Sequence, residues 1–432
     1  FYHGTTGLLS KVERRDSNNT RLFDDMLYEY DTHAQLNRSG VDIGNGGSLV
    51  LASSDRITDV ERSFESYSSA WWVREETKSY PTNGSGSSHT ESLVRARLTG
   101  FDSGELAEVQ MTATNGAVIT RSTTVNTGTK TVTVTTSQAG INNQTETIVN
   151  GFPASATGPD GLTFTTGYDA LGRPNTSVDP RTGTTTTVYH TGTALPSTIT
   201  DAVGLVASYN FDGMGRTVWR KNADNKYARF AYNTRSQLYR QWGDTEFPVE
   251  HGYDATYGDH TTQKTYRGGS GWDGGSWPGS PGTADTTTWT YDAGTGLLNS
   301  KTDALSRAVS YSYNARGQTY QRVAARGPSS SVTTTYSYDG GTGEPTAIGY
   351  SDGTPSVVFY PNRLGHHYQI DDATGTRTFD RCACGRVEGE NLSSFYGSRV
   401  LTYLYETGGG LVGRYKGFQL GSSSGSSSDK SE

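Results

Sequence analysis

The chain has 432 residues, a net charge of −7 and no basic block, and only 32% of its residues are hydrophobic. This charge leaves no electrostatic footprint for nucleic acid, and no stretch approaches the roughly 18–20 apolar residues of a membrane span. The 27 Tyr and 54 Gly favour a β-rich structure with many turns over an aliphatic core or a disordered chain.

Residues 1–160 are predicted to be a β-rich region with degenerate repeats. Tyr28-Glu29-Tyr30-Asp31 favours a strand and a turn over a short helix in the same place. The stretch from Asp42 to Gly47 is predicted to be a Gly-rich turn, because glycines stand where a calcium loop needs oxygen ligands. Farther along, Val and Thr alternate as in half-buried strands, and nothing separates them from the next region.

Residues 161–406 are organised by a repeated hexapeptide, of which Tyr168 to Arg173 is the clearest copy. Phe211 to Arg216 is the nearest to it, and Tyr313 to Gln318 keeps the plan. Tyr291-Asp292 and Tyr338-Asp339 reach their glycines one residue later. Most steps between copies are about 21 residues, and a period in this range indicates a repeat architecture. The anchor residues, weaker copies included, are Tyr168, Tyr189, Phe211, Tyr232, Tyr253, Tyr291, Tyr313, Tyr338, Tyr360 and Phe379.

Each unit is predicted to form a strand, a tight turn and a return strand. An aromatic or apolar residue precedes most anchors by two positions, which places both on one strand face. Asp169 and Gly172 suit the ends of a type I turn. Stacked units would form aromatic pairs from an inward-facing row, each worth about 0.2–1 kcal/mol. The predicted structural residues are Tyr168, Asp169, Gly172, Arg173, Phe211, Asp212, Gly215, Arg216, Tyr291, Asp292, Tyr313, Tyr338 and Asp339.

These phased hexapeptides resemble the repeats of the RHS/YD-repeat family, which includes bacterial toxin shells, wall-associated secreted proteins and teneurins. The resemblance covers about residues 160–405 and, faintly, the earlier part. It implies an all-β fold, a YD/RHS-repeat β-sheet spiral of stacked hairpins that forms a solenoid or a cocoon-like shell. Toxin-shell members end in an autocleaving segment with Asp-Pro-x-Gly. Here Asp179-Pro180-Arg181-Thr182-Gly183 lies in mid-chain, where it predicts a turn and no self-cleavage.

The long step between Tyr253 and Tyr291 predicts a loop insertion at about residues 264–286. Insertions in repeat proteins form loops, often on a binding face. Trp272 and Trp277 in this loop could stack on sugar rings or dock a neighbour, which makes it a candidate binding loop. The favoured alternative is a lid that folds back over the repeats, because apolar rings rarely stay in water.

Cys382 and Cys384, with His366 and His367 about one repeat away, are the one set with metal-ligand residue types. Zinc or copper would suit them, but Cys-x-Cys is not the usual spacing and adjacent histidines point to opposite strand faces. Free thiols or an oxidised pair are favoured, and we predict no metal and no other cofactor. The evenly spaced aspartates indicate turn capping, and the common catalytic motifs are absent. We therefore predict no catalytic residue and no enzymatic activity.

Residues 407–432 form a Gly/Ser-rich tail, predicted to be a flexible linker. Because the chain begins at Phe1 rather than Met, we expect a processed product or a fragment. Repeat stacks without caps leave unpaired strand edges. We therefore predict a secreted or cell-surface structural protein that self-associates, as a homo-oligomer or polymer, into a shell, fibre or tube.

Two alternative functions remain open from the sequence. One is an adhesin or carbohydrate-binding module that contacts glycan or cell wall. The other is a fragment of a toxin-encapsulating RHS shell. No nucleic-acid partner and no membrane span are expected in any of these cases.

Overall fold

The computed structural model describes residues 1–113, 116–326, 330–407, 413–422 and 427–431. The predicted all-β fold is confirmed: 34 strands form one sheet, and within these ranges the only helix is a short 3-10 segment at Ser394–Tyr396. Each strand pairs antiparallel with the strand that precedes it in the chain. No helix of the described ranges is long and apolar enough to cross a membrane.

The N-terminal region contributes the longest strands of the sheet, one of which has 12 residues. It continues directly into the repeats, since Ser155 pairs with Thr165 across the predicted boundary. Its strands are β1 (Lys11–Val12), β2 (Asp25–Tyr30), β3 (Leu36–Asp42), β4 (Arg56–Tyr67), β5 (Ala70–Ser79), β6 (His89–Arg97), β7 (Glu105–Ala113), β8 (Val118–Asn126), β9 (Thr131–Gln138), β10 (Ile141–Val149) and β11 (Phe152–Thr157).

The repeat region forms hairpins whose first strand ends at or beside an anchor residue, as predicted from the hexapeptide. Its strands are β12 (Thr163–Tyr168), β13 (Pro174–Asp179), β14 (Gly183–Tyr189), β15 (Pro196–Thr200), β16 (Val206–Phe211), β17 (Thr217–Lys221), β18 (Tyr227–Tyr232), β19 (Leu238–Gly243), β20 (Val249–Tyr253), β21 (His260–Arg267), β22 (Thr283–Tyr291), β23 (Leu298–Thr302), β24 (Ala308–Tyr313), β25 (Thr319–Ala325), β26 (Ser331–Tyr338), β27 (Pro345–Tyr350), β28 (Val357–Pro361), β29 (His367–Asp372), β30 (Gly375–Arg381) and β31 (Val387–Asn391).

The last strands, β32 (Arg399–Tyr405), β33 (Tyr415–Ser422) and β34 (Ser427–Ser431), extend the sheet into the stretch predicted to be a flexible linker. Composition alone missed the aromatic residues that pair there. Phe418 lies opposite Tyr403, and the Tyr415 ring centroid lies 5.9 Å from that of Tyr405. The remaining residues of that tail lie outside the described ranges.

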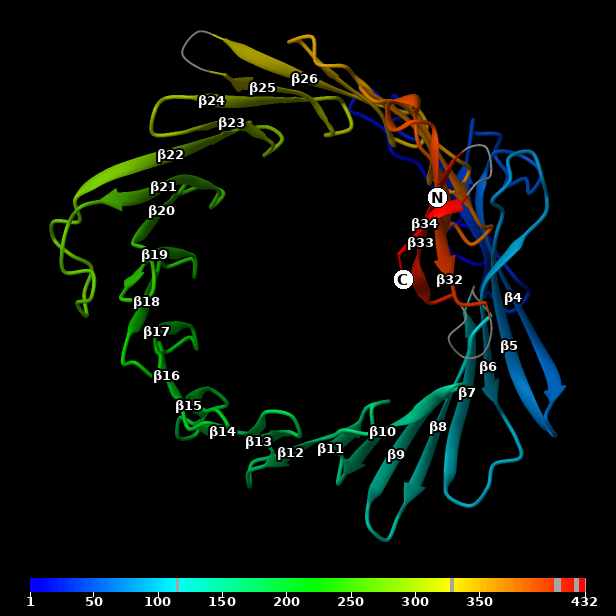
Figure 1. Ribbon diagram of the computed structural model, residues 1–432, viewed down its shortest axis with the longest axis horizontal. Helices are drawn as coiled ribbons and strands as arrows, with labels where there is room; N and C mark the ends of the chain where they lie inside the picture. Colours follow the sequence, from blue (N-terminus) through cyan, green and yellow to red (C-terminus); the bar gives the residue numbers. More distant parts are fainter. Residues whose placement is uncertain (114–115, 327–329, 408–412, 423–426, 432) are drawn as a thin grey trace.

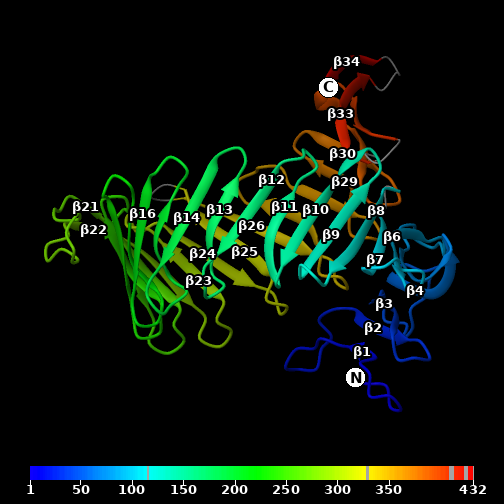
Figure 2. The same ribbon diagram turned by 90° about the horizontal axis from the view of Figure 1, so that it is seen from below.

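The sheet bends into a ring whose two ends overlap. Figure 1 shows β11 to β22 running round one side and the last strands, in orange and red, returning to the side of the ring on which the blue strands β4 and β5 lie. Figure 2 shows that the two ends are displaced along the ring axis, so the sheet is a spiral. Its accessible surface is 24577 Å², whereas a compact protein of this mass exposes about 16,000 Å². The ring is therefore one layer thick and is not filled by a core.

The turns of this meander alternate between the two ends of the strands and so form two rims. All anchor turns, such as residues 169–173 and 212–216, lie on one rim, here called the anchor rim. The connections at residues 43–55, 201–205 and 303–307 lie on the other, here called the opposite rim. Every strand thus presents one end to each rim.

Candidate functional site: the anchor turns and the ring overlap

The side chain of Asp169 holds its turn together. Its Oδ1 accepts hydrogen bonds from the backbone N–H groups of Leu171 at 2.9 Å and Arg173 at 3.0 Å, and its Oδ2 accepts one from Arg173 Nε at 2.7 Å. Gly172 has φ +75°, a left-handed conformation that glycine adopts without strain. Together with the register shift before Tyr168, this is a type I turn closed by a bulge. The hydrogen bonds from Arg173 lower the pKa of Asp169.

The same arrangement recurs along both rims. Asp212 accepts hydrogen bonds from the N–H groups of Met214 and Arg216, and from Arg216 Nε at 2.7 Å. Elsewhere an amide pair replaces the ion pair, as when Asn314 Nδ2 donates to Gln318 Oε1 at 3.0 Å. Turns in which an Asp or Asn side chain accepts from the N–H groups two and four residues later begin at Asp16, Asp31, Asp169, Asp201, Asp212, Asn222, Asn233, Asp303, Asn314 and Asn362.

Tyrosine hydroxyl groups link most repeats to the one before. Tyr232 Oη donates to the carbonyl oxygen of Thr217 at 3.1 Å, and Thr217 is the register partner of the preceding anchor, Phe211. Tyr313 bonds in the same way to Leu298, the partner of Tyr291, at 2.9 Å. The same bond is made by Tyr189, Tyr253, Tyr291 and Tyr338. The side chain of each anchor tyrosine therefore fixes the distance between its hairpin and the preceding one.

In two of the repeats an arginine side chain fills the space between successive anchor rings. The rings lie two strands apart, about 9–10 Å, which is too far for direct contact. The Arg173 guanidinium lies 4.5 Å from the Tyr189 ring centroid, and that of Arg216 lies 4.7 Å from Tyr232. Cation–π contacts therefore join these anchors, where the sequence predicted direct aromatic pairs.

Phe211 is the anchor that lacks the linking hydroxyl, and this gives a prediction. In Phe211→Tyr, the new hydroxyl should reach the carbonyl of Pro196, which is the register partner of Tyr189. We expect the free energy of unfolding to rise by about 0.5–1.5 kcal/mol, the net contribution of one hydrogen bond, measured as a shift in the urea midpoint. Tyr232→Phe is the matched reverse change and should lower it by a similar amount. Equal midpoints for both variants would contradict the linking role.

The copy assigned to Tyr360 is shifted by one residue. The register shift that marks each anchor falls at Pro361, and Asn362 opens the turn by accepting from the N–H groups of Leu364 and His366, each at 3.0 Å. Tyr360 thus lies one position before the anchor. The error arose because Pro361 stands where an aromatic anchor was expected, so the aromatic residue one position earlier was taken for it.

The copy assigned to Phe379 is shifted by two residues, because Cys382 stands where other turns have Asp. The Cys382 N–H donates to the carbonyl of Arg386 at 3.0 Å, and the Gly385 N–H donates to the carbonyl of Cys382 at 2.9 Å. Cys382 forms a disulfide with Cys384. In most of the other anchor turns, the first residue is an Asp or Asn whose side-chain oxygen accepts a hydrogen bond from the N–H group two residues later. Here the disulfide links the residues at the same two positions.

The two ends of the ring are joined at Arg363, where the anchor rim meets the opposite rim. The Arg363 side chain is buried, with 5% exposed. Its Nε donates to the carbonyl of Asp55 at 2.7 Å, and its Nη atoms donate to those of Thr82, Ser85 and Leu51, each at 3.0 Å. One guanidinium thus binds four carbonyl groups that precede it by about three hundred residues in the chain. Burial lowers its pKa, but an arginine stays charged.

A second set of contacts strengthens this overlap. Arg56 and Glu344 form a bidentate ion pair with N–O distances of 2.5 and 2.6 Å. The Asp24 N–H donates to the carbonyl of Gly341 at 2.9 Å. Arg316 lies over the Phe23 ring, 4.7 Å from its centroid. In every contact an anchor-rim residue meets a residue of the opposite rim.

Buried side chains gather beneath the overlap. Leu27, Leu49, Ile57 and Tyr80 form an apolar cluster, and Arg363 lies 5.7 Å from the centre of the Tyr80 ring. Burial, together with the nearby Asp59 carboxylate, raises the pKa of Tyr80 to about 12. The overlap therefore contains a packed core of the kind that the single-layered arc does not need.

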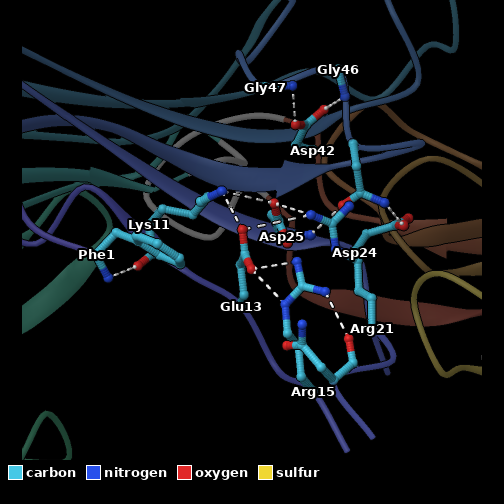
Figure 3. A network of polar contacts seen from close by, with 12 residues as sticks. Phe1, Lys11, Glu13, Arg15, Arg21, Asp24, Asp25, Asp42, Gly46 and Gly47 are labelled. Carbon is cyan, nitrogen blue, oxygen red and sulfur yellow. Dashed lines mark hydrogen bonds and ion pairs between the residues drawn. The ribbon is translucent and has the colours of Figure 1, made fainter.

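A polar network stiffens the opposite rim beside the overlap (Figure 3). Asp42 is 1% exposed and accepts hydrogen bonds from the N–H groups of Gly46 and Gly47 at 2.9 and 2.6 Å. Asn45 bonds to Asp24 through its Nδ2 at 2.9 Å. The stretch is thus the predicted Gly-rich turn, in which the carboxylate is occupied by its own backbone.

Comparison with known proteins finds only distant structural similarity. No family model matches the sequence, and no curated protein matches it. Among solved structures, a TcdB2-TccC3-TEV crystal structure is 12% identical with a TM-score of 0.49, over 96% of this chain and 25% of that one. The Photorhabdus luminescens Tc holotoxin pore with a TccC3 mutation is 11% identical with a TM-score of 0.46, over 97% and 26%. This chain spans about a quarter of the length of those chains.

The inserted loop lies between β21 and β22, at residues 268–282, and folds back onto the sheet. The ring centroids of Trp272 and Trp277 lie 5.1 Å apart, and both lie within 5.7 Å of that of Tyr266. Trp242, which is 7% exposed, donates from Nε1 to the carbonyl of Gly274 at 3.2 Å. Both loop tryptophans are half-buried, in the arrangement of a lid.

The structure does not assemble the Cys/His metal set. Both sulfur atoms are bonded to each other, which removes the thiolates that zinc or copper would bind. His367 stacks on Phe359 with ring centroids 5.0 Å apart, and His366 lies against Gly385. Among the described residues, no group of three or more His, Cys, Asp and Glu side chains is placed to hold a metal ion.

The turn carboxylates predict sensitivity to acid. Arginine and N–H donors lower the pKa of Asp169 and Asp212, and Lys11 and Arg15 lower that of Glu13 to about 2. A carboxyl group whose pKa is lower in the folded than in the unfolded state stabilises the fold at pH values above its unfolded pKa, which is about 3.9–4.3. This stabilisation is lost as the pH falls through the pKa of the folded state. We expect a small fall in the urea midpoint from pH 7 to 5, where burial lowers the pKa of His251, His260 and His366 below the unfolded value, and a steeper fall from pH 4 to 2. A midpoint that is unchanged at pH 2 would contradict this.

Proposed function

We propose that this protein is a structural wall segment that encloses a lumen and performs no chemical reaction. The observation that carries the proposal is a single-layered sheet that bends into a ring and binds its own other end through Arg363. The turn aspartates support it, because their oxygen atoms are occupied by backbone N–H and arginine donors. Turn aspartates committed in this way maintain hairpin spacing and are poorly placed to act as a general acid or base.

We also infer that the chain is an RHS/YD-repeat protein that is secreted or displayed at the cell surface. The turn geometry supports this, since it recurs at the hexapeptides that carry the resemblance. The Cys382–Cys384 disulfide fits an oxidising compartment. Self-association into a shell, fibre or tube belongs to the same proposal.

The toxin-encapsulating shell remains the second candidate, because a ring that is not filled by its own core has room for a payload. Expression of the chain together with its flanking gene sequences, followed by protease protection of whatever they encode, would identify such a payload. The adhesin hypothesis has less support, because Trp272 and Trp277 pack against Tyr266. A glycan array with Trp272→Ala/Trp277→Ala as the control tests it directly.

The decisive experiment measures the shape of the purified chain. A compact protein of 432 residues has a radius of gyration of about 22 Å. We expect small-angle X-ray scattering to give a clearly larger value, and negative-stain images of single particles to show a ring with an open centre. A compact particle near 22 Å would overturn the proposal.

A further inference from the structure

The overlap shows that the two rims of this sheet are complementary surfaces. Arg363 and Glu344 come from anchor turns, whereas their partners, including Asp55 and Arg56, belong to connections of the opposite rim. The chain therefore already contains one working example of an anchor rim bound to an opposite rim. The same two surfaces continue round the rest of the ring.

In the remaining arc, both rims expose large apolar side chains at the tips of their turns. On the anchor rim, Leu171 and Met214 are each 71% exposed and Tyr257 is 73% exposed. On the opposite rim between β15 and β24, Val203 (80%), Phe247 (87%) and Leu305 (72%) are exposed in the same way. Isolated exposed apolar residues are ordinary, but here they gather on the two surfaces that bind each other at the overlap.

These side chains are not needed to form their own turns. Within their own turns, Met214 and Val203 act only through their backbone N–H groups, which donate to Asp212 and Asp201; Met214 Sδ also accepts a long contact of 4.0 Å from Ser236 Oγ of the next anchor turn. A polar residue would close the same turn and would remain hydrated. Their apolar character therefore has a use outside the hairpin.

We propose that the uncovered anchor rim, marked by Leu171, Met214 and Tyr257, docks onto the opposite rim of a second copy of this chain, marked by Val203, Phe247 and Leu305. This inference rests on the proposed wall function and names the surface and the partner by which the wall grows. The accessible surface, about one and a half times that of a compact protein, supports it, because copies that stack rim to rim bury part of this excess.

The proposed contact has a defined polarity. One rim binds the other, so the interface is heterologous and leaves a free rim at each end of the stack. At the overlap, the anchor rim of one part of the spiral lies on the opposite rim of another part. A second copy docked through the same two rims therefore continues the spiral. The product is an open-ended tube rather than a closed dimer.

Two triple variants of the full chain test the proposal by sedimentation velocity over a concentration series. One carries Leu171→Asp, Met214→Asp and Tyr257→Asp; the other carries Val203→Asp, Phe247→Asp and Leu305→Asp. We expect the wild type to associate, and each variant to show an apparent Kd raised by at least about 100-fold, because three apolar contacts become charged. Phe64→Asp is the matched control, since Phe64 is 72% exposed but lies within β4, and it should associate like the wild type.

Mixing the two triple variants gives the sharpest result. Each retains one intact rim, so the mixture should form 1:1 complexes and no larger species. A wild type that stays monomeric at every concentration would overturn the proposal, as would triple variants that associate like the wild type. Circular dichroism establishes that the variants are folded. If the wild type is monomeric but forms open rings, the proposed docking is wrong and the proposed wall function is unaffected. If the monomers are compact, both proposals are wrong.

Discussion

Replacing Arg363 by alanine is expected to open the ring. Four backbone carbonyl groups, from Leu51, Asp55, Thr82 and Ser85, lose their donor together. At about 1 kcal/mol for each hydrogen bond, closure of the overlap should weaken by about 3–5 kcal/mol. Hydrogen exchange should accelerate in residues 43–56 and 80–88, while amides of the distant repeats keep their protection. The radius of gyration should rise at the same time.

Two further variants separate geometry from charge. Arg363→Lys keeps the positive charge, but its three donors sit on one nitrogen atom and cannot span four carbonyl groups, so an intermediate effect is expected. Arg267→Ala removes an arginine whose side chain is 73% exposed and which pairs with Asp285 far from the overlap, and it should change neither measurement. If Arg363→Ala leaves exchange at the overlap unchanged, the ring is held by other contacts.

The second large effect concerns the Asp–Arg pair of the anchor turn. We expect the turn to tolerate replacement of both residues together but not of either one alone. Asp212→Asn alone leaves Arg216 without its carboxylate, and Arg216→Gln alone leaves Asp212 without its cation. In each single variant the amides of this turn should exchange faster than in the wild type. The double variant recreates the amide pair found between Asn314 and Gln318 and should restore exchange close to the wild-type rate.

Hydrogen exchange at the amides of Met214 and Arg216 is the appropriate measurement, because both donate to Asp212 in the intact turn. Exchange reports on this turn alone, whereas a denaturation midpoint reports on the larger unit that unfolds with it. The double-mutant cycle then gives the coupling energy directly. Additive losses in the double variant would show that the two side chains act independently.

The hexapeptide was predictable from the sequence because its information is local. Asp169 and Gly172 encode a turn within five residues, so the anchors could be phased without any knowledge of the ring. The opposite-rim turns at Asp201 and Asp303 use the same side-chain bonds. They escaped notice because no tyrosine precedes them. Asn362 escaped for a related reason, since Pro361 and not an aromatic residue precedes it.

The overlap could not be predicted, because its chemistry leaves no pattern in the sequence. Arg363 binds backbone carbonyl groups, and any residue supplies a carbonyl group. Its position also depends on the accumulated bend of all the intervening strands. The C-terminal strands illustrate the opposite error: Ser and Gly dominated the composition there, although Tyr415 and Phe418 pair with β32.

The pairing of each strand with its chain neighbour has a consequence for how such proteins diverge. A hairpin could be gained or lost anywhere in the arc without rerouting the chain, but it would change the circumference by two strand widths, roughly 9–10 Å. Arg363 would then arrive beside the wrong carbonyl groups. The circumference of the ring can therefore change only by whole hairpins. Such a change is tolerated only where new contacts replace those of Arg363 and join the two ends of the sheet again.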